Sequence, residues 1–397
     1  MIKCALRHNS IFPFQFLIWT FFRDIETTLI SYFFDLDYLL IYTPLMFLGE
    51  FLAGLTFYLY QKQFLSKKKK GKITNFMPIQ FVKAKHRLIK DSKTKIIFLL
   101  ITTSVSDFVQ FVILLQTSKF MTLSGSLEQR LRGIFTINYA LFYHYILRLP
   151  IFKHQIFSLI IIAICIIIVI ITEFIFQEIN IFLSYVEFIY AFLLIFIAIF
   201  FSTLMESIEK YLFEYNELNP FLTLLFEGIF GFILTSIYCI FNSPFDDIIN
   251  FYKNKQTYEF TLLIFTLILY VILSGGKNSF RVVTTKIYSP MTSSFMEYIL
   301  NPFYLIYYFI SGSDFISLGK NNFVYFIINF VISLIITFCG GVYNEFLILF
   351  CCGLERDTYI QVRNRSNFEN ELNKLYEGDD DDSSISSDYI LELNNIE

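Results

Sequence analysis

The chain has 397 residues, of which 55% are hydrophobic and only 16% are charged. Soluble domains carry charges at roughly a quarter of their positions, so this composition excludes an ordinary soluble fold and predicts a membrane protein. The formal net charge of -3 is the sum of a basic segment and an acidic tail, which lie far apart in the chain. The total therefore indicates little about partners.

The first apolar stretch, Ile11–Phe22, is too short to cross a hydrocarbon core that needs about twenty residues. Three charged residues, Arg23, Asp24 and Glu26, come directly after it. The stretch either forms an interfacial helix, acts as a signal-like apolar region, or continues to Phe34 as a weak first membrane helix.

Nine longer apolar blocks follow, and each is expected to form a membrane helix. The blocks are Tyr38–Tyr60, Ile96–Leu115, Gly133–Leu147, Ile156–Ile175, Leu183–Met205, Leu222–Phe241, Phe260–Ser274, Met291–Ile310 and Phe323–Cys339.

Basic residues gather on one side of this predicted topology. The segment 61–95 carries twelve Lys and Arg, and cytosolic loops are enriched in these residues. Lys210 and the group Lys277, Arg281 and Lys286 are expected in loops on the same side. If the N-terminus with Lys3 and Arg7 lies on this side too, a crossing is required before the block at Tyr38. We therefore expect ten membrane helices with both termini in the cytosol.

Two parts of the chain follow the same order of polar turn, short helix and long apolar helix: Ser124–Thr172 and Ser289–Phe338. Many transporters build alternating access from such a two-fold repeat of about five helices each. We divide the chain into four segments. These are an N-terminal segment 1–36 with the weak first helix, a first repeat 37–180 with the basic cytosolic loop 61–95, a second repeat 181–353, and a polar, acidic, disordered cytosolic tail 354–397.

Three stretches resemble a known family: SLEQRLRGIFTINYALFYHYILR at 126–148, SIEKYLFEYNELNPFLTLLFEGIFGFI at 207–233 and KNSFRVVTTKIYSPMTSSFMEYILNPFYLIYYF at 277–309. They are similar to helices of the drug/metabolite transporter superfamily, in its nucleotide-sugar-transporter-like solute carrier family 35 (EamA-like) branch. The resemblance covers roughly Tyr38 to Gly353. It implies an all-α fold of ten membrane helices in two inverted five-helix repeats.

The resemblance also implies secondary-active transport of a small metabolite by alternating access, through exchange or proton coupling. Anionic compounds such as nucleotide sugars are among the substrates that it implies. The implied location is an endomembrane, such as Golgi, endoplasmic reticulum, lysosome or vacuole, and a homodimer is one of the implied assemblies. The partners expected are the lipid bilayer and a small-molecule substrate, without nucleic acid.

Arg132 is the first candidate for substrate contact, because Gln129, Arg132 and Gly133 match the family pattern and a guanidinium group suits a phosphate or carboxylate. The alternative is an arginine at a helix start that reaches toward the headgroups. Lys277 is a further candidate beside a cavity mouth, with a plain topological charge as its alternative.

Intramembrane acids supply the remaining candidates, in the order Glu297, Asp107 and then Glu50, with Glu227 beside them. Acids at membrane depth usually face a cavity or a partner, and each of these can instead be structural. Glu297 is expected to couple or gate transport and to pair with Arg132 across the site. Asn301 lies four residues after Glu297 and just before Pro302, which frees a backbone carbonyl near Tyr298.

An enzymatic function is not expected. The four histidines are scattered, and the sequence holds no GxSxG, HExxH or nucleotide P-loop motif. We expect no catalytic residue, cofactor, metal site or ATP-driven step. The alternatives to transport are a non-transporting scaffold or receptor that keeps the fold and, less favoured, an intramembrane transferase.

Overall fold

The computed structural model describes residues 2–4, 11–34, 38–60, 91–120, 131–146, 151–177, 185–242, 257–311 and 322–350, with five single positions after them. These residues form ten α-helices and two short strands. Most of the basic loop, the candidate Gln129 and almost all of the acidic tail lie outside the described residues.

Each predicted apolar block is helical over the residues that the structure describes. The helices are α1 (Ile11–Phe34), α2 (Tyr38–Tyr60), α4 (Lys93–Phe120), α6 (Gly133–Tyr145), α7 (Lys153–Gln177), α8 (Tyr185–Tyr215), α9 (Pro220–Asn242), α11 (Thr257–Ile287), α12 (Pro290–Ser311) and α13 (Asn322–Tyr343). Within the described residues, six of them are long and apolar enough to cross a membrane: α4, α7, α8, α9, α11 and α13. The protein is therefore an all-α integral membrane protein. The first apolar stretch continues as one helix to Phe34.

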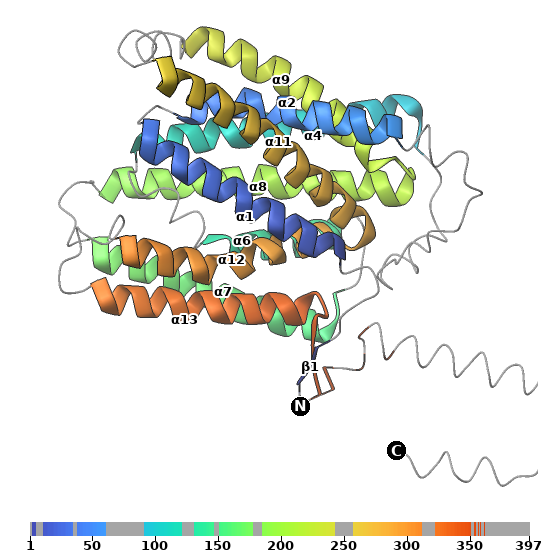
Figure 1. Cartoon of the computed structure of the whole chain (residues 1–397). Coiled ribbons are helices and arrows are strands. Elements are labelled where there is room, and N and C mark those ends of the chain that lie inside the picture. The colour runs from blue at the N-terminus through green and yellow to red at the C-terminus, as the bar shows by residue number, and fades with distance from the viewer. Residues whose placement is uncertain are drawn as a thin grey trace, which may run out of the picture.

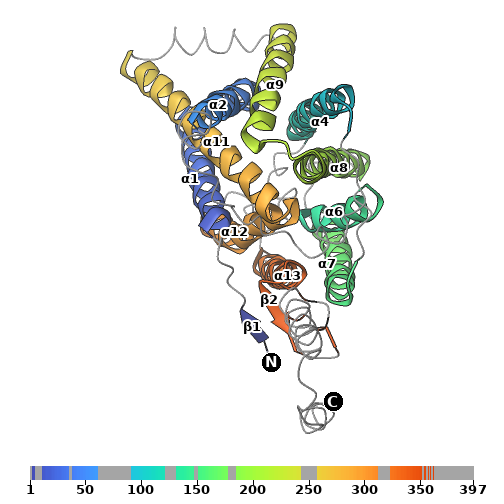
Figure 2. The ribbon, with the colours of Figure 1, turned by 90° about the vertical axis from the view of Figure 1, so that its right-hand side faces the viewer.

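The helices run side by side along one common direction, as Figure 1 shows, and Figure 2 looks nearly along their axes. Helix α2 packs on α9 and α11, α4 on α8 and α9, α1 on α11 and α12, and α7 on α13. The strand β1 (Ile2–Cys4) pairs antiparallel with β2 (Leu347–Leu349), with Lys3 opposite Ile348. The N-terminal strand and the segment after α13 thus lie at the same end of the bundle.

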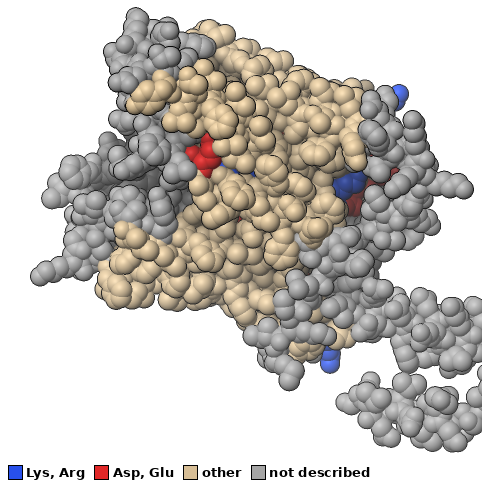
Figure 3. All heavy atoms as spheres, viewed as in Figure 1, with Lys and Arg blue, Asp and Glu red and all other residues tan. Residues whose placement is uncertain are grey.

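The side of the bundle in Figure 3 presents almost no charged side chain between its two ends, over the part that the structure describes. Elsewhere on the surface, α7 exposes a row of isoleucines that includes Ile160, Ile164, Ile167 and Ile171. Such a continuous apolar surface is unfavourable in water and is typical of helices that face lipid.

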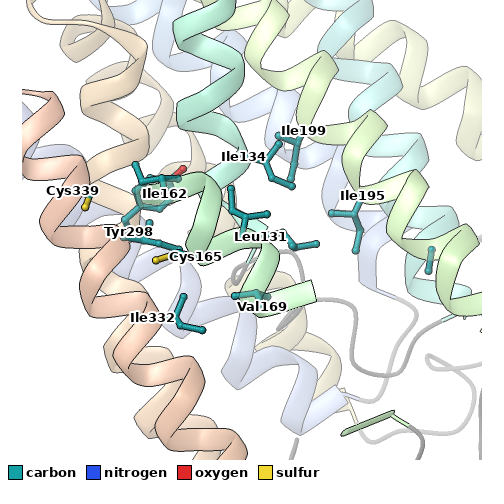
Figure 4. Packing of buried hydrophobic residues seen from close by; sticks show 13 residues of the cluster. Leu131, Ile134, Ile162, Cys165, Val169, Ile195, Ile199, Tyr298, Ile332 and Cys339 are labelled. Atoms are coloured by element: carbon teal, nitrogen blue, oxygen red, sulfur yellow. The ribbon is translucent and has the colours of Figure 1, made fainter. Parts of the chain in front are cut away.

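A cluster of branched aliphatic side chains holds the short helix α6 in the bundle (Figure 4). Leu131, two residues before α6, and Ile134 of α6 share one buried core with Ile162 of α7 and Ile195 of α8. Tyr298 of α12 and residues of α13 complete this core. Close packing here fixes the backbone around Arg132.

Glycines let α2 approach two neighbours closely. A Cβ atom added at Gly228 of α9 would meet the backbone of Phe51, and one added at Gly49 would meet the carbonyl of Val271 on α11. Small residues at helix crossings are a common device in membranes. Because Glu50 follows Gly49 and Glu227 precedes Gly228, the close crossings bring both acids between helices.

Helices α8 and α11 each have 31 residues and extend well past the predicted blocks. The loop expected around Lys277, Arg281 and Lys286 is therefore wrong, because these residues lie in α11 up to its last turn. Lys210 likewise lies in α8, where it is fully buried and donates to Glu214 across 2.8 Å. The helices continue because buried partners compensate the charges, which hydropathy alone does not register.

Candidate functional site

Glu297 of α12 binds two cations from other parts of the bundle. Its Oε2 lies 2.6 Å from Nη1 of Arg132, just before α6, and its Oε1 lies 3.0 Å from Nζ of Lys277 on α11. The side chains of Arg132 and Glu297 are 19% and 21% exposed. Arg132 thus pairs with Glu297, as the predicted two-fold repeat led us to expect. Hydrogen bonds between two charged groups are stronger than those between neutral groups.

Tyr298, the residue after Glu297, binds the backbone of Arg132, whose side chain contacts Glu297. The Tyr298 hydroxyl donates to the backbone carbonyl of Arg132, and the Thr136 hydroxyl lies 3.3 Å from the Tyr298 hydroxyl. Pro302 frees the carbonyl of Tyr298, which accepts a hydrogen bond of 3.2 Å from Thr337 of α13. The expected polar break therefore borders protein.

Helix α1 adds a second ion pair to this region. Arg23 Nη2 lies 2.7 Å from Oδ1 of its neighbour Asp24, whose Oδ2 accepts a hydrogen bond of 2.5 Å from Tyr304 of α12. Both residues also interact electrostatically with Lys277. We name the five charged residues Arg23, Asp24, Arg132, Lys277 and Glu297 the Glu297 cluster. With three bases and two acids, it has a surplus of positive charge.

A small, partly open pocket lies beside the cluster, between α6, α7, α12 and α13. Its polar lining includes Tyr298, Asn301 and Asn329, and Gly133 lines it on the α6 side. The candidate Asn301 thus lines a pocket one helical turn from Glu297.

A second set of charges surrounds Arg281, one turn beyond Lys277 on α11. Arg281 lies 2.9 Å from Glu209 of α8, 3.5 Å from Glu227 of α9 and 3.9 Å from Glu206 of α8. Glu209 and Glu227 are fully buried.

Two further candidate acids face the same region. Glu50 of α2 accepts a hydrogen bond of 2.5 Å from Asn278 of α11 and interacts electrostatically with Asp107 of α4. Asp107 in turn interacts with Arg281 and Glu209. We name Glu50, Asp107, Glu206, Glu209, Glu227 and Arg281 the Arg281 cluster.

Both clusters lie well inside the helices. At 1.5 Å per residue, Arg281 is about 9 Å and Lys277 about 15 Å from the end of α11. Glu227 and Glu297 are each about 10 Å from the starts of their helices. The acids and bases on α8, α9 and α11 therefore lie away from the ends of helices that are long and apolar enough to cross a membrane.

No protein-family model matches the chain, and no curated protein matches it. The function is therefore argued from the chemistry of the two clusters. In the described part of the chain, no three His, Cys, Asp or Glu side chains are placed to hold a metal ion.

At the end of the bundle where α4 begins and α8 ends, a polar network ties these two helices together. Asp91 accepts hydrogen bonds of 2.7 Å from both Lys95 and Tyr211, and one of 3.2 Å from Asn216. Burial by itself would raise the pKa of Asp91, but these donors lower it below its usual value. Asp91 therefore stays ionised at neutral pH.

The structure brings the predicted residues together in two groups. Arg132, Glu297 and Lys277 belong to the Glu297 cluster, with Asn301 beside it. Glu50, Asp107 and Glu227 belong to the Arg281 cluster.

Arg281 was predicted in a loop and not in the site, and Glu206, Glu209 and Asp24 were not predicted as site residues either. A usable signal was present, because residues three or four positions apart share one helix face. Lys277 and Arg281 are four apart, and Glu206 and Glu209 are three apart.

Proposed function

We propose that the protein is a secondary-active transporter that moves a small anionic metabolite by alternating access. One observation carries this proposal: Glu297 joins Arg132, from the first half of the chain, to Lys277 of α11 inside the helical bundle. Ionisable groups inside a membrane are expensive and commonly mark a substrate or ion path.

The pattern of helix packing supports two inverted repeats. If α1, α2, α4, α6 and α7 correspond in order to α8, α9, α11, α12 and α13, most neighbour relations occur twice. The packing of α4 on α8 corresponds to that of α11 on α1, and α4 on α9 corresponds to α11 on α2. Contacts of α6 with α7 and α8 correspond to those of α12 with α13 and α1. The pairs α2 with α9, α6 with α12 and α7 with α13 map onto themselves. Transporters with a two-fold relation of this kind commonly bind their substrate at the junction of the halves.

The substrate class follows from the charge of the Glu297 cluster. Arg132 offers a planar fork of donors that fits a carboxylate or phosphate, and Lys277 adds a second cation. An anionic substrate can take the place of the Glu297 carboxylate between these two groups. The resemblance to nucleotide-sugar transporters agrees with this chemistry and favours an endomembrane.

Pairing of β1 with β2 supports an even number of crossings, because it holds the N-terminal strand and the end of α13 at one end of the bundle. Ten helices with both termini in the cytosol fit this arrangement. The Lys- and Arg-rich segment 61–95 assigns that end to the cytosol.

Uptake by purified protein in proteoliposomes tests the proposal. A panel of nucleotide sugars, other phosphorylated metabolites, amino acids and neutral sugars is offered outside, with or without unlabelled compound inside. We expect saturable uptake of an anionic member that is stimulated by counterflow. Arg132→Ala should abolish it, whereas the matched control Arg356→Ala, at an exposed arginine after α13, should not.

Uptake that Arg132→Ala leaves unchanged would remove the Glu297 cluster as the substrate site. If no compound is taken up by the wild type, transport itself is refuted, and the non-transporting scaffold or receptor becomes the better proposal.

A further inference from the structure

We infer that the Arg281 cluster is a proton-binding site inside the membrane, and that its acids take up and release protons as a group. The site is distinct from the Glu297 cluster, which we assign to the substrate. Its role in driving transport rests on the proposed function, but proton binding itself does not.

The cluster holds far more acid than base. Five carboxyl groups face the single guanidinium of Arg281. The next base, Lys277, is bound to Glu297. All five acids are almost completely buried, with at most 8% of any of them exposed. Several kcal/mol are needed to bury one ionised carboxylate without a counter-charge, so acids in this position take up protons instead.

Several carboxylate oxygens of the cluster receive no hydrogen bond from the described residues, which also indicates that the ligand is a proton. Within the described part of the chain, Glu227 Oε1, Glu206 Oε2 and Glu50 Oε2 are buried and have no hydrogen-bond partner. The other oxygen of Glu227 lies 3.5 Å from Arg281, so this carboxyl group faces the cluster. A proton removes the charge from such an oxygen and needs no further ligand, whereas a metal ion needs several, and the described residues place no such ligand set here.

The groups that surround these acids do not supply enough positive charge. Tyr139 of α6 and Glu297 of α12 face Glu206 and add no base. Lys277 of α11 interacts with Glu50 and Asp107, but its ammonium group also faces Arg23, Asp24 and Glu297. The surplus of acid over base therefore persists when every neighbouring helix is included.

This assignment moves the titrating role away from Glu297. Each oxygen of Glu297 contacts a cation, at 2.6 and 3.0 Å, so its negative charge is already compensated. In the Arg281 cluster, both oxygens of Glu209 contact Arg281 at 2.9 Å, and the other four acids share that one cation. Protons are therefore the counter-charge available to the acids that Arg281 leaves uncompensated.

Protons bound here can bias the conformation of the bundle. Glu50 and Asp107 lie on α2 and α4, in the first half, while Glu206, Glu209 and Glu227 lie on α8 and α9, in the second. Release of protons places like charges on both sides of this junction, and their repulsion is strong where the dielectric constant is low. A change in proton occupancy thus favours one arrangement of the halves over the other.

Infrared spectroscopy of the full chain in liposomes tests proton binding without any substrate. We expect the carbonyl stretch of protonated carboxylic acids to be present at neutral pH and to disappear at alkaline pH. Glu227→Gln and Glu206→Gln should each reduce the band by the equivalent of a single carboxyl group. The control Asp91→Asn should leave it unchanged, because Asp91 is ionised. A wild-type spectrum without the band, or a band that both Gln variants leave intact, would overturn the inference.

Because the two Gln substitutions lie on different helices, failure of one variant to fold leaves the other to decide. A transport measurement then separates this inference from the proposed function. Under an imposed proton gradient, the Gln variants should keep counterflow exchange but lose accumulation. If the wild type transports nothing while the infrared band behaves as expected, the transporter proposal fails and the proton site stands. If accumulation persists in both Gln variants, these acids do not couple protons to transport.

Discussion

The contact between Glu297 and its two cations predicts an asymmetric response to mutation. Glu297→Gln leaves Arg132 and Lys277 side by side without a carboxylate, whereas Arg132→Gln leaves Glu297 with Lys277 still 3.0 Å away. Loss of the acid should therefore destabilise the protein more than loss of the arginine.

The magnitudes follow from burial and contact distance. Removing one member of a buried ion pair costs about 3 to 5 kcal/mol, and the partial exposure of Glu297, 21%, favours the lower end. Arg132→Gln removes one charged hydrogen bond, worth about 1.5 to 3 kcal/mol. Both single substitutions remove the same contact between Arg132 and Glu297. The loss of unfolding free energy in the double variant should therefore be smaller than the sum of the two single losses, by about 1 to 3 kcal/mol.

The fluorescence of the only tryptophan gives the assay. Trp19 of α1 stacks on Phe280 of α11, with ring centroids 6.4 Å apart, so its emission reports separation of these helices during denaturant unfolding in detergent. Glu173→Gln serves as the matched control, because the Glu173 carboxyl is a buried acid that accepts a hydrogen bond of 2.6 Å from Tyr325. Additive losses, or a larger loss for Arg132→Gln than for Glu297→Gln, would refute the reasoning.

Three further predictions address other parts of the molecule. Asp91→Asn should lower the thermal unfolding midpoint at neutral pH. Because the pKa of Asp91 is lowered in the folded protein, the difference in midpoint from wild type should shrink as the pH falls below about 4. A difference that stays constant with pH would contradict this. Gly228→Leu should cost about 1 to 3 kcal/mol or more in the same unfolding assay, because its Cβ would meet the backbone of α2, while Ile240→Leu on the exposed face of α9 should cost little. Glycosylation sites inserted after residues 5 and 385 should remain unmodified and one between 242 and 258 should be modified; modification at either terminus would exclude the ten-helix topology.

The positions of the helices could be read from the sequence because each helix must cover its backbone polar groups and present apolar side chains to lipid. Nine apolar blocks and the stretch that begins at Ile11 all became helices. The ends of α8 and α11 could not be read in this way. Hydropathy treats Lys210 and Arg281 as loop residues, while the fold places buried partners beside both of them.

By itself, the sequence determined a helical membrane protein and the positions of its acids along the chain, and it supplied Arg132 and Glu297 as candidate residues. Only the tertiary structure decided which charges meet. Arg132 and Glu297 are 165 residues apart, and whether they touch depends on how α6 and α12 pack. The acids also differ in their neighbours: Glu297 contacts two cations, whereas five acids surround Arg281. The balance of charge around a buried group is a property of space rather than of sequence spacing, because electrostatic energy depends on distance and on the dielectric surroundings.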